Sequence, residues 1–282
     1  MTRDRHRQGF TLVELAMVLF IMALLLGSLM YILPAHYEQR QRGDTTRGLE
    51  EAKELLLTFA IVNGRFPCPA SPTSNGAESE TVAGTRECTH YYTGFLPARA
   101  IGFQPQDGAG YGLDAWGNRI RYAVAKARPV NSQSPRICRP VNATLLPQAI
   151  HFTHKDNLKL QGIECAPNDL VICGSYNGIA PTASPPSCGT APSVTNQNVV
   201  SAVIWSQGKN FGKTYGAPAI AGQAGEDERV NNKNAGGATD HAVFVYHPMT
   251  TPEAPGGEFD DLMVWIPAGQ LYGRLIAAGV LP

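Results

Sequence analysis

Residues 9–15 of the chain read GFTLVEL, and they open the apolar run FTLVELAMVLFIMALLLGSLMYIL at residues 10–33. This run has 24 residues and a single charge, at Glu14. A helix of that length measures about 36 Å, which is enough to cross a bilayer core of about 30 Å. The run is also too long for an ordinary secretory signal. It therefore predicts a membrane helix, with the segment 1–9 ahead of it and all remaining residues behind it.

The charges around the run predict its orientation. The segment 1–9 contains Arg3, Arg5 and Arg7 against one acid, Asp4. Arginine-rich flanks stay in the cytoplasm, so residues after Leu33 are expected on the other side of the membrane. The whole chain has a formal net charge of zero. A nucleic-acid binder would normally carry a basic face, so we expect no nucleic-acid partner.

Glu14 is unusual at this position, because placing a carboxylate within a membrane helix costs a few kcal/mol or more unless the carboxylate has a partner. One interpretation is an interfacial acid that reaches back to the lipid headgroups. The string GFTLVEL supports another, because it resembles the class III signal of type IV prepilins and type II secretion pseudopilins. That resemblance implies that a prepilin peptidase cuts after Gly9 and methylates the new N-terminal residue, Phe10. It also implies that Glu14 pairs with the N-terminal amine of a neighbouring subunit, which makes both buried charges tolerable.

The segment 34–63 is expected to continue the helix as an amphipathic stretch. Pro34 ends the apolar run, and apolar residues then recur at helical spacing at Leu49, Ala52, Leu56 and Phe59. Gly64 is a plausible stop. Two interpretations are open: two helices with a hinge near Gly43, or, as the resemblance implies, one long kinked helix. We favour the single helix, although a glycine in a helix costs about 1 kcal/mol.

Residues 64–282 form the predicted head. With 29 glycines, 21 prolines and only 16% charged residues, the chain suits a turn-rich, β-leaning body. The resemblance implies an α+β, pilin-like fold, in which the long helix packs on an antiparallel β-sheet with long disulfide-bearing loops. Mixed β-branched and aromatic runs predict strands at 119–125, 148–152, 169–173, 199–206, 242–247 and 261–266. Loops are expected at 69–90, 174–198 and 207–240, and a short helix at 270–279.

The six cysteines all lie in the head, at Cys68, Cys88, Cys138, Cys165, Cys173 and Cys188. An even count in a translocated domain predicts disulfides. A metal site is less well supported, since there is no C-x-x-C spacing. Cys68–Cys88 is the best single pairing because it closes the first loop after the helix. The other four are expected to pair among themselves.

Two stretches of the head are loosely similar to the major type II pseudopilin. Residues 114–122 read DAWGNRIRY and predict a tight turn that enters a strand, with Trp116 buried beneath it. The loop that begins SQGKNFG at residue 206 and the acids after it are similar to the calcium-binding loop of that family. The resemblance implies a calcium ion with ligands from Asn210, Asp227, Asp240, Asp260 and Asp261. A solvated acidic loop is the alternative, since the family's loop aspartate is Asn210 here.

These features predict a mechanical rather than a catalytic function, because no nucleophile–base pair is recognisable. The glycine-rich residues 108–112, GAGYG, lack the strand-before, helix-after context of a nucleotide loop. The resemblance implies a subunit held in the bacterial inner membrane, with a cytoplasmic N-terminus and a periplasmic head. It would then be assembled with other pilins by the inner-membrane assembly platform, as a minor subunit of a type IV pilus or secretion pseudopilus. The alternative is a filament-presented adhesin that recognises a sugar or surface. An exposed Tyr91–Tyr92 pair would fit this role, but burial of the two side chains fits their sequence equally well.

Overall fold

The structure is a computed structural model that describes residues 11–126, 152–164, 166–183, 185–196, 198–210, 225–233, 240–254 and 256–281. Residues 26–35, 160, 161 and 164 are described by their backbone only. The chain divides into two compact units, residues 1–43 and residues 44–282, each of which is described by itself.

Helix α1 (Leu12–Asn63) is one element of 52 residues, so the prediction of a single long helix, rather than two separate helices, is confirmed. In the first unit its apolar side chains are exposed, with Leu12 85% and Phe20 66% accessible. Among the residues whose side chains the structure describes, no helix is both long and apolar enough to cross a membrane. The helix ends where the sequence predicted, because Gly64 follows it with a left-handed φ of 67°.

In the second unit the last turns of α1 bury one face against a sheet. Leu49, Ala52, Leu56, Leu57 and Ala60 are almost inaccessible. The sheet has four antiparallel strands in the order β1 (Gly94–Phe95), β2 (Arg121–Val124), β4 (Val200–Ser206) and β6 (Leu262–Pro267). Every residue of β4 is buried. This matches its mostly apolar sequence, VSAVIWS, and its position between β2 and β6.

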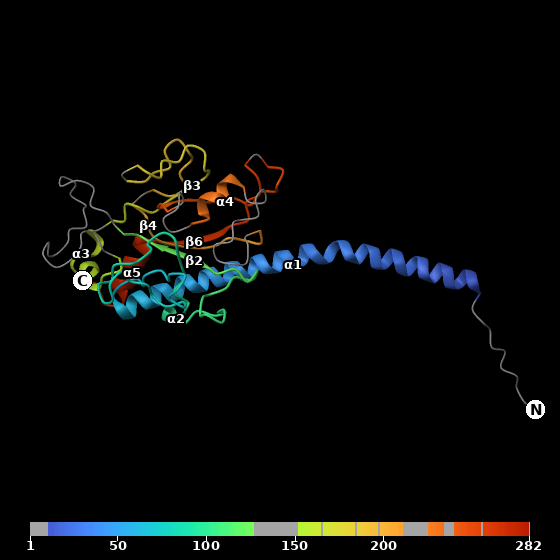
Figure 1. Ribbon diagram of the computed structural model, residues 1–282, viewed down its shortest axis with the longest axis horizontal. Helices are drawn as coiled ribbons and strands as arrows, with labels where there is room; N and C mark the ends of the chain where they lie inside the picture. The colour runs from blue at the N-terminus through green and yellow to red at the C-terminus, as the bar shows by residue number, and fades with distance from the viewer. Residues whose placement is uncertain are drawn as a thin grey trace, which may run out of the picture. The chain divides into compact units, whose positions relative to one another are not determined.

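Helix α5 (Ala268–Ala277) confirms the predicted C-terminal helix and buries Leu271 and Leu275. Figure 1 shows it beside the last turns of α1, where Arg274 forms a 3.0 Å ion pair with Glu54. The predicted strands at 119–125, 169–173, 199–206, 242–247 and 261–266 each overlap an observed strand, with ends that differ by at most two residues. The predicted strand at 148–152 is wrong at Phe152, which lies in a turn, and its other residues are outside the described ranges.

The expectation of a purely antiparallel sheet needs correction. Strands β3 (Val171–Cys173) and β5 (Val243–Val245) form a separate parallel pair. Short helices that the sequence analysis missed are α2 (Ala98–Ile101), α3 (Lys155–Gln161) with the 3-10 turn η1 (Gly162–Glu164), and α4 (Glu226–Asn231). Helix α4 lies within 207–240, which had been predicted to be a loop throughout.

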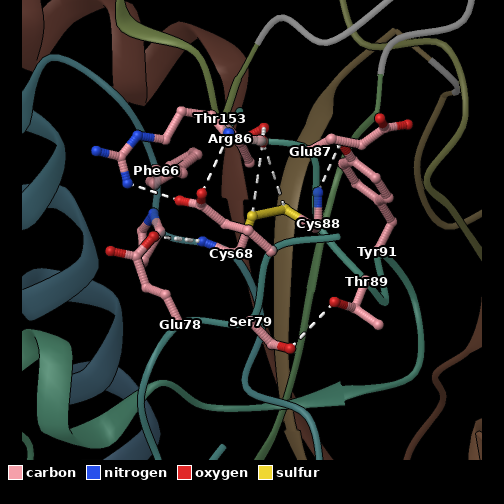
Figure 2. Close-up of a disulfide and its surroundings, with 12 residues drawn as sticks. Phe66, Cys68, Glu78, Ser79, Arg86, Glu87, Cys88, Thr89, Tyr91 and Thr153 are labelled. Atoms are coloured by element: carbon pink, nitrogen blue, oxygen red, sulfur yellow. Dashed lines mark hydrogen bonds and ion pairs between the residues drawn. A yellow bond between two sulfur atoms is a disulfide. The ribbon is translucent and has the colours of Figure 1, made fainter. Parts of the chain in front are cut away.

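Two disulfides are described, Cys68–Cys88 and Cys173–Cys188. The first confirms the pairing chosen from the sequence, and the second joins two of the remaining four cysteines. Cys138 and Cys165 lie outside the described residues. Figure 2 shows the Cys68–Cys88 bridge beside Glu78, whose carboxylate accepts 2.7 and 3.0 Å hydrogen bonds from the Arg65 guanidinium and one of 3.0 Å from the Cys68 N–H. The bridge and this ion pair together fix the first loop after α1.

Candidate functional site

The first turn of α1 holds Glu14 in a reciprocal cap with Thr11. The Thr11 N–H and hydroxyl both donate to Glu14 Oε2 at 3.0 Å, and the Glu14 N–H donates to Thr11 Oγ1 at 3.3 Å. This is a capping box, in which two backbone donors of the first turn are satisfied. The sequence signal for this cap is a threonine followed three residues later by a glutamate. Gly9 and Phe10 lie outside the described residues.

The turn at residues 114–118 is a junction between three parts of the second unit. Its Asp114 carboxylate accepts the N–H groups of Trp116 and Asn118 at 2.9 and 2.8 Å, and the Ser206 hydroxyl at 2.5 Å. On the other side, the Ala115 N–H donates to Thr45 Oγ1 of α1 at 3.1 Å. The predicted tight turn is confirmed, with Gly117 at a φ of 83°. Trp116, however, is only half-buried, so its predicted burial is wrong.

The same junction leads to the predicted calcium loop. Asn118 donates its side-chain amide to the Gly208 carbonyl at 2.6 Å, and the Lys209 N–H donates to Asp260 Oδ2 at 2.9 Å. Gly208 has a φ of 66°, and a Cβ there would lie 1.9 Å from Asp260 Oδ1. Only glycine lets the loop approach this carboxylate so closely.

Three buried carboxyl groups meet at this loop. Oxygen atoms of Glu228, Asp260 and Asp261 all lie within 4.8 Å of one another, and none of the three residues is more than 4% exposed. Glu228 comes from α4 and accepts the Asp260 N–H and, at 3.0 Å, the Asn210 side-chain amide. Asp261 accepts the Asn231 side-chain amide at 2.8 Å.

The electrostatic state of this acidic cluster follows from its burial. Loss of solvation, with the charge of Asp260 next, raises the pKa of Glu228 to about 8. Burial also raises the pKa of Asp260, and burial followed by the Glu228 charge raises the pKa of Asp261 well above its usual value. Three adjacent carboxylates cannot all ionise cheaply in a buried place, so the cluster must hold protons or a cation.

The donor set suits a hard divalent cation, which prefers carboxylate and carbonyl oxygens. Asp260 Oδ1 is buried and accepts no hydrogen bond from the described residues. A buried polar atom without a partner costs about 1–3 kcal/mol, and a cation would satisfy it. Glu228, Asp260 and Asp261 are therefore the residues that fit such an ion.

The structure brings together only part of the predicted ligand set. Asp260 and Asp261 lie in the acidic cluster, and Asn210 touches its edge through its amide nitrogen rather than an oxygen. Asp227 lies elsewhere, because its carboxylate accepts the Tyr176 N–H at 2.5 Å and lies 3.2 Å from His247 Nε2. Asp240 is exposed, and its charge acts on His90 and Lys233. The expectation for these two aspartates is therefore wrong.

Glu228 is the member that sequence reasoning missed. It belongs to the acidic stretch 226–228, but only the formation of α4 turns Asp227 and Glu228 toward different neighbours. A six-residue helix without an apolar stripe leaves no periodic signal by which this could have been foreseen.

Comparison with known proteins bears on the N-terminal region. Residues 4–30 match the family model described as the prokaryotic N-terminal methylation motif. The methylation motif thus covers the start of helix α1, where the Thr11–Glu14 cap lies. This match agrees with the resemblance of residues 9–15 to the class III signal of type IV prepilins and pseudopilins. No curated protein and no solved structure matches the chain.

Proposed function

We propose that the chain is a structural subunit of a filament of the type IV pilin class. The observation that carries this proposal is the methylation motif at residues 4–30, which heads one continuous helix of 52 residues. Prepilin peptidase would cut after Gly9 and methylate Phe10. The apolar run 10–33 would hold the precursor in the inner membrane, with the N-terminus in the cytoplasm and the head in the periplasm.

The exposed apolar side chains of α1 support assembly through this helix. In the described part of the first unit, residues such as Leu12, Met17 and Phe20 are more than half exposed. Apolar surface of this kind needs either lipid or the helices of other subunits around it. Glu14 would then give up its hydrogen bonds to Thr11 and pair with the N-terminal amine of a neighbouring pilin. The inner-membrane assembly platform would bring the two subunits together.

The second unit supports a pilin-like fold. Its features are a helix end packed on a four-stranded antiparallel sheet and loops closed by disulfides. The additional β3–β5 pair and α4 enlarge the head, which favours a minor subunit of a pilus or secretion pseudopilus over the repeating one. The observation offered for an adhesin does not favour that role, because Tyr91 and Tyr92 are buried, at 8% and 7% exposure.

We further propose that the acidic cluster binds calcium. Its support is the convergence of Glu228, Asp260 and Asp261, together with the buried Asp260 Oδ1 that accepts no hydrogen bond within the described residues. Bound calcium would supply positive charge that fixes the loop after β4 to the start of β6. In this proposal its contribution is structural.

Mass spectrometry of the protein recovered from sheared filaments tests the main proposal. We expect a mature chain that begins at Phe10 and carries one added methyl group at its N-terminus. A filament-incorporated chain that retains residues 1–9 would contradict it. Failure of the chain to enter filaments, when other pilins of the same cell do, would contradict the assembly role.

A further inference from the structure

A polar hollow lies on the second unit, away from the acidic cluster. Its volume is about 540 Å³, and it is lined by Asn75, Arg99 and residues 106–110. This is within the range of roughly 300–1,000 Å³ that small-molecule sites occupy. The lining consists of the side-chain amides of Asn75 and Gln106, the Arg99 guanidinium, the Asp107 carboxylate and the glycine-rich backbone of residues 108–110. Such a lining suits a polar ligand.

At the floor of the hollow, the backbone of residues 75–76 packs directly against the backbone of Gly110. A Cβ on Gly76 would lie 1.8 Å from the Gly110 carbonyl oxygen, and one on Gly110 would lie 2.8 Å from the Asn75 carbonyl oxygen. Both glycines also have left-handed φ values, 69° and 91°. Glycine is therefore required at both positions, and the floor is held firmly in place. This explains Gly110 within the glycine-rich stretch at 108–112, for which a nucleotide-binding role was not supported.

The Asp107 carboxylate in the lining already accepts hydrogen bonds from within the protein. Asp107 Oδ1 accepts the N–H groups of Ala109 and Tyr111, each at 2.9 Å, and Oδ2 accepts Arg119 Nε at 2.7 Å. Asp107 therefore shapes the loop, and Arg119 balances its charge. It leaves no uncompensated negative charge in the hollow.

The charge that remains is that of Arg99. Its backbone N–H donates to the Gly76 carbonyl at 3.0 Å, and its Cδ lies 2.6 Å from the position of a Cβ on Gly110. The side chain thus crosses the bare backbone of the glycine-rich stretch. Arg99 is exposed, and among the described residues no carboxylate forms an ion pair with its guanidinium. Its exposed guanidinium can therefore form a two-pronged pair with the carboxylate of a ligand.

We propose that this hollow binds a carboxylate-bearing sugar unit, with the carboxylate on Arg99 and the hydroxyl groups on the side chains of Asn75 and Gln106. The polar lining selects against an apolar ligand, and the balanced Asp107 leaves an excess of positive charge. The site is separate from the methylation motif and from the acidic cluster. It gives the head a recognition function besides its role in the filament.

Calorimetric titration of the full chain in detergent micelles, at constant ionic strength, tests the site. The probes are glucuronate, glucose and inorganic phosphate. We expect glucuronate to bind at least tenfold more tightly than glucose, because a charge-assisted fork is lost with the neutral sugar. Phosphate is expected to bind at least tenfold more weakly than glucuronate, since it lacks the hydroxyl contacts of the ring.

Two variants assign the binding to this hollow. Arg99→Gln removes the charge and should weaken glucuronate binding at least tenfold. Gly108→Leu keeps the charge but fills the hollow, since a Cβ at Gly108 meets nothing within 4 Å. It should weaken binding by a similar factor without disturbing the fold. The matched control is Arg47→Gln, which removes an exposed arginine of α1 and should leave binding unchanged.

The proposal is overturned if glucose or phosphate binds as tightly as glucuronate. It is also overturned if Gly108→Leu binds glucuronate like the unmodified chain. Equal losses in Arg99→Gln and Arg47→Gln would show a general charge effect and would likewise exclude the site.

Discussion

Ser206 and Asp114 are separated by 92 positions in the chain, and the Ser206 hydroxyl donates to Asp114 Oδ2 at 2.5 Å. This bond joins the end of β4 to the turn at residues 114–118. Because the same turn also binds Thr45 through Ala115, it holds α1, the sheet and the loop of the acidic cluster together. The turn that was predicted from the sequence thus connects three parts of the second unit.

Ser206→Ala should destabilise the second unit. The variant leaves the buried Asp114 carboxylate without one of its donors, and a hydrogen bond to a charged group contributes about 1.5–3 kcal/mol. Urea unfolding followed by tryptophan fluorescence should show this loss. The matched control is Ser79→Ala, whose hydroxyl makes an exposed 3.1 Å contact with Thr89, and its effect should stay below about 0.5 kcal/mol. Equal losses in the two variants would contradict the role of the Ser206–Asp114 bond.

Each described disulfide should contribute about 3 kcal/mol to the free energy of unfolding. The bridges Cys68–Cys88 and Cys173–Cys188 close loops with separations of 20 and 15 residues, so the loop-closure entropies are similar. Replacing both cysteines of one bridge by serine should therefore cost nearly the same for either bridge. Chemical unfolding of the two double variants measures this. A cost below about 1 kcal/mol for either would mean that the bridge constrains little.

The elements that could be predicted from the sequence are those with a local or periodic cause. Gly64 ends α1 because its left-handed φ suits glycine, and β4 was predicted because its sequence combines β-branched and aromatic residues. The pairing of β3 with β5 has no local signal, since parallel neighbours are brought together only by tertiary packing. The acidic cluster was half predicted: Asp260 and Asp261 adjoin a strand, whereas Glu228 depends on a helix too short to show periodicity.

Without metal ions, the contribution of Glu228 to the stability of the second unit should fall as pH rises from about 4 to about 8. The folded pKa of Glu228 is raised to about 8, while its unfolded value is about 4.5. Between these values the folded state binds more protons than the unfolded state, so the free energy of unfolding decreases with pH. The raised pKa values of Asp260 and Asp261 act in the same direction. Thermal unfolding in chelator should show that the unmodified chain loses stability relative to Glu228→Gln across this range.

Calcium should reverse this loss at pH 8. An ion that binds only the folded state stabilises it by about 2.7 kcal/mol at a hundredfold excess over Kd. The melting temperature should therefore rise on addition of calcium, and Asp260→Ala with Asp261→Ala should abolish the rise. Asp227→Asn is the matched control, because Asp227 lies outside the acidic cluster, and it should retain the response. Identical melting in calcium and in chelator would leave proton binding as the sole way in which the cluster is neutralised.

The last prediction separates two roles of Glu14, helix capping and ion pairing. The Thr11–Glu14 cap is a reciprocal one, and glutamine can replace glutamate in such a cap because it keeps an acceptor oxygen. Glu14→Gln therefore preserves the start of α1 but removes the charge, whereas Glu14→Ala removes both. If Glu14 acts by pairing with the amine of a neighbouring subunit, both variants should be processed normally and both should be strongly depleted from sheared filaments. Quantitative immunoblotting of the membrane and filament fractions measures this. Normal incorporation of Glu14→Gln, with Glu14→Ala excluded, would show that the cap rather than the charge is needed for assembly.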